Sequence, residues 1–74
     1  MNPYRTARNQ TLVALSAADE ITHLVTEAAL DSEAGNFPAP GMADKTGLLA
    51  SLAAQQAIFD QQVALAIKTI TDLG

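Results

Sequence analysis

The sequence has no cysteine and no tryptophan, a single histidine and few charged residues. Without cysteine the chain can form neither disulfide bonds nor thiolate metal sites, and one histidine is too few for a histidine-rich metal site within one chain. Only 16% of the residues are charged, whereas an ordinary soluble protein has roughly 25%. A surface so short of charge is typical of one that meets other protein.

The length of 74 residues predicts one small domain that spans residues 1–74. A single core of this size rarely supplies more than about 3–5 kcal/mol unless something else stabilises it. Disulfides and metal sites of the usual kinds are excluded, so oligomerisation or docking on a partner remains. We therefore expect a protein partner, which is either further copies of the chain or a larger assembly.

The formal net charge is −4, and the cations Arg5, Arg8, Lys45 and Lys68 are scattered along the chain. Nucleic-acid-binding proteins gather their cations on one face, so we expect no nucleic-acid partner. The acids gather in the first half of the chain, and we interpret them as a solvated helix face. The alternative is that they mimic phosphate. These acids are Asp19, Glu20, Glu27, Asp31 and Glu33.

Long hydrophobic runs are also absent. No run approaches the roughly 20 apolar residues that span a bilayer, so we expect no transmembrane segment. The apolar stretch from residue 11 to residue 18 is short for a signal peptide and contains Ser16. We expect no cleaved signal peptide, and a chain that either stays in the cytoplasm or leaves it uncleaved as part of an assembly.

The first half of the chain predicts an amphipathic helix over about residues 4–30. Asn2 and Pro3 can begin it, because proline in the first turn of a helix loses no hydrogen bond. No glycine or proline follows until after Leu30. One face of this helix is predicted to be apolar. Its residues are Val13, Ala14, Ala17, Ala18, Ile21, Leu24, Val25 and Ala28.

Glycine, asparagine and proline predict a loop over about residues 31–42, with Phe37 as its anchor, and a second helix over about residues 43–73. A loop so short beside two long helices makes them fold back on each other. The fold class is therefore all-α, an antiparallel two-helix hairpin that packs in an oligomer or complex.

The second helix has an apolar stripe with the 3-4 spacing of a helix–helix interface, interrupted by Gln56. Further apolar residues lie beside this stripe, so the helix has more apolar surface than one neighbour can cover. We expect the stripe and its flanking face to form the functional interface. The interface residues predicted are Leu49, Leu52, Gln56, Phe59, Val63, Ile67, Ile70 and Leu73.

Candidate chemistry is sparse. Glu20 and His23 have the Glu-x-x-His spacing of di-iron bundles, but both lie on the polar face, and we interpret His23 as solvated between Asp19 and Glu27. No serine has a histidine placed to activate it, and no glycine-rich phosphate loop is present. We expect no catalytic residues, no metal, no cofactor and no enzymatic activity.

The hairpin resembles the small axial subunits of type III secretion needles and of flagellar rods, which are short, cysteine-free and exported without cleavage. The likeness is carried by Pro38 and Pro40 in the turn, by Gln61, and by the pairs Ile67-Lys68 and Asp72-Leu73. It covers about half of the chain. One residue separates the two prolines here, whereas needle subunits usually have two. The resemblance implies a subunit of a helical filament.

Two functions follow from these observations. The first is a structural subunit that acts through helix–helix packing in a secretion-type or other helical filament or in a virion-like assembly. The second is a small acidic binding module, of the kind found in phages and mobile elements, that docks on a host protein and regulates or inhibits it.

Overall fold

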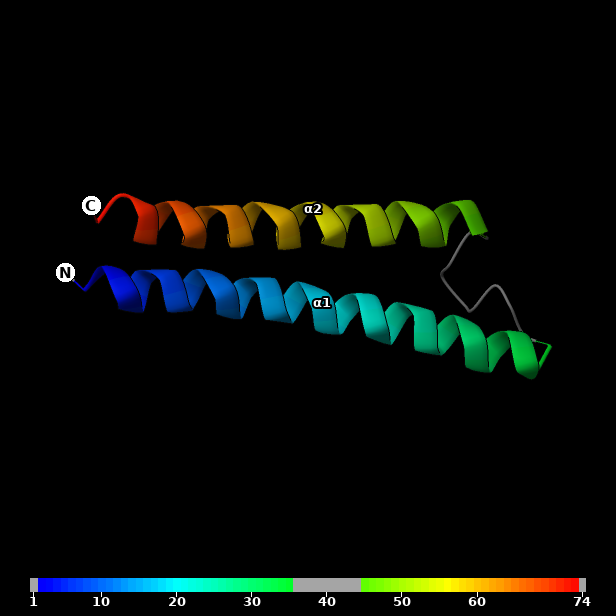
Figure 1. Cartoon of the computed structure of the whole chain (residues 1–74). Helices are drawn as coiled ribbons and strands as arrows, with labels where there is room; N and C mark the ends of the chain where they lie inside the picture. The colour runs from blue at the N-terminus through cyan, green and yellow to red at the C-terminus, as the bar shows by residue number, and fades with distance from the viewer. Residues whose placement is uncertain (1, 36–44, 74) are drawn as a thin grey trace.

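The computed structural model describes residues 2–35 and 45–73, and these form two α-helices. Helix α1 runs over Pro3–Glu33 and α2 over Lys45–Thr71. The two lie side by side and antiparallel, so that the first turns of α1 lie beside the last turns of α2 (Figure 1). The predicted all-α helical hairpin is confirmed for the described residues.

The first turn of α1 is held by Asn2. Its side-chain oxygen Oδ1 accepts hydrogen bonds from the backbone N–H groups of Tyr4, at 3.0 Å, and Arg5, at 3.3 Å. These N–H groups have no partner within a helix, so the cap stabilises the turn. Pro3 follows at the position where proline is best tolerated.

The predicted start of the loop at residue 31 is wrong, because α1 continues to Glu33. Asp31, Ser32 and Glu33 contain no helix breaker, whereas Gly35 adopts the positive φ of 78° that favours glycine. The N–H of Gly35 donates to the Ser32 carbonyl at 3.1 Å and closes the helix. The expected loop anchor Phe37 and the expected first residues of α2 lie outside the described residues.

The two helices meet through small side chains. Ala7, Ala14 and Ala17 of α1 and Ala66 of α2 are the buried residues of the part of the chain that the structure describes. Such side chains let two helices approach closely. The predicted apolar face of α1 is central to this contact, but its two edges, Val13 and Val25, are exposed. Its half-buried members are Ala18, Ile21, Leu24 and Ala28.

The side of α2 that faces α1 is more polar than the predicted stripe. Leu48, Gln55, Gln62 and Thr69 lie seven residues apart along one side of the helix, and all four are half-buried. This side shares Leu52 with the predicted interface and also includes the buried Ala66. The side that faces α1 and the predicted stripe are rotated by roughly 50° from each other about the helix axis. This is the angle between neighbouring positions of a seven-residue repeat, which divides the circumference of the helix into seven.

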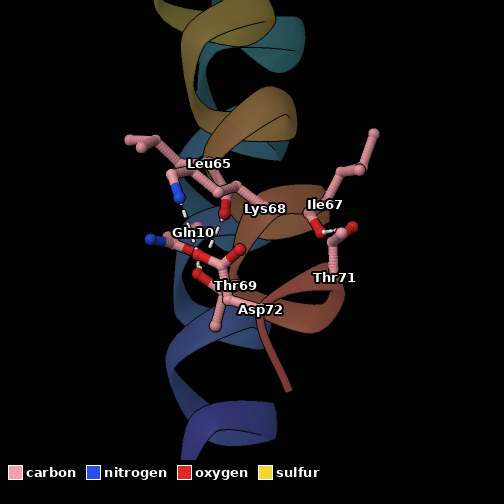
Figure 2. A network of polar contacts seen from close by, with 7 residues as sticks. All are labelled: Gln10, Leu65, Ile67, Lys68, Thr69, Thr71 and Asp72. Atoms are coloured by element: carbon pink, nitrogen blue, oxygen red, sulfur yellow. Dashed lines mark hydrogen bonds and ion pairs between the residues drawn. The ribbon is translucent and has the colours of Figure 1, made fainter. Parts of the chain in front are cut away.

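Thr69 also makes a polar contact across the hairpin (Figure 2). Its hydroxyl lies 3.0 Å from Oε1 of Gln10 on α1 and 2.9 Å from the carbonyl oxygen of Leu65. A hydroxyl has one hydrogen, so it donates to one of these oxygens at a time. Nearby, on the outside of α2, Lys68 donates to Asp72 at 2.6 Å. The Gln10–Thr69 contact fixes which turns of the helices meet.

The molecule is a rod of 54 × 17 × 15 Å. Its radius of gyration is 16.2 Å, whereas a compact chain of this length has about 11 Å. A rod two helices thick has no interior, and no side chain in residues 2–35 or 45–73 is both large and fully buried. The fold therefore presents most of its side chains on its surface.

Candidate interaction surface

The exposed surface of the hairpin is rich in large apolar side chains. Thirteen of them are exposed within the described residues, against four buried alanines. Scattered apolar residues are ordinary on a protein surface, but contiguous ones mark interaction sites. The thirteen are Tyr4, Leu12, Val13, Leu15, Val25, Leu30, Leu49, Ile58, Phe59, Leu65, Ile67, Ile70 and Leu73.

The interface residues predicted from the sequence are mostly accessible to a partner. Leu52 and Val63 are half-buried by the hairpin itself, and Gln56 is exposed. The other five are among the exposed large side chains, from Phe59 at 37% to Ile67 at 62%. That a partner covers them stays a prediction. The five are Leu49, Phe59, Ile67, Ile70 and Leu73.

One long side of the hairpin collects apolar residues from both helices. On α2, Leu49, Val63 and Ile70 are separated by multiples of seven residues, so they lie along one line beside the contact with α1. On α1, Tyr4 and Val25 are likewise three heptads apart. Leu15 on α1 and Ile67 on α2 lie next to these lines, farther from the contact between the helices and on the same side of the hairpin. We call this side the apolar flank: Tyr4, Leu15, Val25, Leu49, Val63, Ile67 and Ile70.

Two shallow grooves between the helices open on the apolar flank. The larger, of about 530 Å³, lies near the chain ends between Tyr4 and Thr11 of α1 and Ile67 and Ile70 of α2. The smaller, of about 300 Å³, lies near the other end of the rod, where Val25 and other α1 residues meet Leu48. The grooves share this side because their α1 residues Tyr4, Thr11, Val25 and Ser32 are spaced by multiples of seven.

The apolar flank carries almost no charge. Arg8 lines the larger groove, and Asp60 lies seven residues before Ile67 on α2. Asp19 lies one helical turn after Leu15, at the outer edge of the flank. The flank and this edge therefore carry a formal charge of −1, whereas the whole chain carries −4. The other long side, which we call the opposite flank, is different. It has Val13, Ile58 and Leu65, but the acids Glu20 and Glu27 share the line of Val13 along α1.

The polar residues singled out from the sequence do not converge. Nε2 of His23 lies 3.9 Å from Oε1 of Glu27, and both side chains are more than half exposed. Within residues 2–35 and 45–73, no three or more histidine, cysteine or acidic side chains are grouped so that they could hold a metal ion. The same residues contain no buried side-chain polar atom that lacks a hydrogen-bond partner.

Neither α1 nor α2, as described, combines the length and the hydropathy that a membrane-spanning helix requires. Comparison with known proteins finds no matching family model, no similar curated protein and no similar solved structure. The surface of the hairpin is therefore the basis for an assignment of function.

Proposed function

We propose that this chain is a structural subunit that acts by packing its helices against other protein chains, which are copies of itself or related subunits. The observation that carries the proposal is the imbalance between the hairpin's interior and its surface. Among the described residues only four alanines are buried, whereas thirteen large apolar side chains stay exposed.

The energetic reason lies in the area that these side chains leave in water. Burial of one Leu, Ile or Phe side chain contributes on the order of 1.5–3 kcal/mol. A hairpin of this length has little stability of its own, since a small single core supplies about 3–5 kcal/mol at best. Burial of several of the exposed side chains against a partner would therefore contribute an amount comparable with the hairpin's own stability. The proposed role involves no chemical step. It depends on the apolar area that the partner buries and on the alignment of the packed helices.

The resemblance to axial subunits of secretion needles and flagellar rods extends this proposal to a helical filament. In those assemblies, short helical hairpins stack along an axis. A rod-shaped hairpin of 54 × 17 × 15 Å, apolar along its length, has a shape suited to such stacking. A closed bundle would use the same faces, and the two assemblies differ in whether the rotation between neighbours closes.

The molar mass of the purified chain by light scattering, over a hundredfold range of concentration, tests the proposal. We expect a mass above that of one 7.7-kDa chain, which either settles at a small multiple or rises towards filaments. A monomer at every concentration would contradict self-assembly.

A second function, an acidic module that binds and regulates another protein, is favoured by one observation. Asp19, Glu20, Glu27 and Glu33 are all exposed on α1. A complex held by these acids would weaken strongly between about 0.05 and 0.5 M salt, because the screening length for exposed charges falls from about 14 Å to about 4 Å over this range. Association through apolar side chains would persist over this range.

A further inference from the structure

We propose that a second copy of this chain covers the apolar flank, so that two hairpins form a four-helix dimer. The inference rests on the proposed function and names the partner and the face. The flank contributes Tyr4, Leu15 and Val25 from α1 and Leu49, Val63, Ile67 and Ile70 from α2. In the dimer, the two grooves of one hairpin receive side chains of the other.

The area left exposed by one hairpin matches what a dimer buries. The chain exposes 5205 Å² of solvent-accessible surface, whereas a compact protein of the same mass exposes roughly 4,300 Å². The excess of roughly 900 Å² is close to the roughly 800 Å² that each partner contributes to a standard protein interface. One contact with a chain of similar size therefore brings the accessible surface into the ordinary range.

The distribution of charge favours the apolar flank as the contact and a second copy of the chain as the partner. Two copies with a net charge of −4 each repel, so they meet most easily where each presents the fewest unpaired acids. The apolar flank has the cation Arg8 and the anion Asp60, with Asp19 at its outer edge, so only one acid is in excess there. The opposite flank presents Glu20 and Glu27, and two such surfaces would place like charges close together. A basic partner would instead favour the acids of α1.

The apolar flank is also continuous with the contact inside the hairpin. Leu52 and Ala66 of α2 face α1, and Leu49, Val63 and Ile70 lie directly beside them on the same helix. In a four-helix bundle each helix contacts two neighbours at about a right angle around its axis, which requires two adjacent apolar stripes. On α2, helix α1 occupies a side that combines Leu52 and Ala66 with half-buried polar residues, and the apolar stripe next to that side is left free. A two-fold pairing uses the same patch on both copies, so it closes on itself.

The experiment compares two isoleucines of α2 that lie on either side of the hairpin contact. Ile70, on the apolar flank, is 42% exposed, and Ile58, on the opposite flank, is 39% exposed. Ile70→Glu and Ile58→Glu are therefore the same change at matched exposure. Sedimentation equilibrium gives the dimer dissociation constant of each variant and of the unchanged protein, and far-UV circular dichroism verifies that each remains helical.

We expect Ile70→Glu to raise the dimer dissociation constant at least about tenfold, because each dimer would bury two carboxylates without partners. Ile58→Glu should change it about threefold or less, as a substitution outside an interface does. Ile67→Glu, at the most exposed position of the flank on α2, should repeat the effect of Ile70→Glu and serves if that variant loses helicity.

The outcomes separate the inference from the proposed function. If Ile58→Glu dissociates the protein as much as Ile70→Glu, or if neither change affects it, the apolar flank is not the dimer interface, although association as such stands. If the unchanged chain is a monomer at every concentration, both the inference and the self-assembly on which it rests are wrong. An assembly larger than a dimer that survives Ile70→Glu also overturns the inference.

Discussion

The close approach of α1 and α2 at Ala17 leads to a sharp prediction. Ala17 is 3% exposed, so a larger side chain has no route to solvent at this position. Ala17→Leu adds three carbon atoms at the contact between the helices. Either the helices move apart and the neighbouring alanines lose their contacts, or the leucine takes a strained conformation.

Overpacking of this kind costs about 1–3 kcal/mol. For a chain of this size, each kcal/mol lowers the melting temperature by roughly 4–8 °C. We therefore expect Ala17→Leu to melt roughly 5–20 °C below the unchanged protein. The assay is thermal unfolding followed by circular dichroism, with all variants at one chain concentration because association also affects the melting temperature.

Ala64→Leu is the matched control. Ala64 lies in the interior of α2 and is exposed, and alanine and leucine differ by only a few tenths of a kcal/mol in helix propensity. This variant should melt within about 2 °C of the unchanged protein, since a few tenths of a kcal/mol corresponds to that shift. Equal melting temperatures for Ala17→Leu and Ala64→Leu would refute the close helix contact at Ala17.

Three further predictions concern the helix ends and the polar contact. Asn2→Ala removes the cap on Tyr4 and Arg5 and should cost about 0.5–2 kcal/mol in urea unfolding; Asn2→Ser should retain most of that stability. Gly35→Ala places a side chain at a φ of 78°, where space is free but the backbone conformation costs about 1–2 kcal/mol; Gly35→Asn should cost less, and equal stability of both variants with the parent would exclude this conformation. Thr69→Val leaves the Gln10 amide without the Thr69 hydroxyl and should cost about 0.5–1.5 kcal/mol, whereas the double change Gln10→Leu and Thr69→Val should recover that stability or exceed it. A double-mutant cycle in urea with no coupling between Gln10 and Thr69 would contradict the contact.

The helices themselves could be predicted because the signals for them are local. The residues from Tyr4 to Leu30 contain no breaker, and the capping group at Asn2 and the glycine at position 35 are legible from the sequence. The alanines at the centre of the contact, Ala14 and Ala17, also follow from the period of the apolar residues. The predicted end of α1 lies three residues before the observed end at Glu33, since Asp31, Ser32 and Glu33 are compatible with helix as well as with loop.

The rotation of α2 against α1 could not be predicted from the same pattern. Periodicity ranks the sides of a helix by hydrophobicity, and the most apolar side of α2 includes Leu49, Val63 and Ile70. The structure turns Gln55, Gln62 and Thr69 towards α1 instead. Long polar side chains can extend from such a contact to solvent, as one helix covers only part of another. The most apolar side of α2 is thus left free. The periodicity of apolar residues does not determine which of two adjacent sides of α2 contacts α1 and which is free for another chain.

The apolar flank was visible in the sequence only in part. Its α2 members belong to the interface predicted from the sequence, but the line of Tyr4, Thr11 and Val25 along α1 lies outside that prediction. The seven-residue spacing of this line was the available signal. It is weak by itself, because Thr11 interrupts it and Arg8 lies beside it.

The dependence of the melting temperature on chain concentration tests the central claim most directly. If exposed apolar side chains of the hairpin are buried against other copies, folding and association are coupled, and dilution destabilises the helices. We predict that the melting temperature rises steadily over a hundredfold increase in concentration, as the population of assembled chains grows. A melting temperature that stays constant over this range, together with a monomeric mass, would contradict the account.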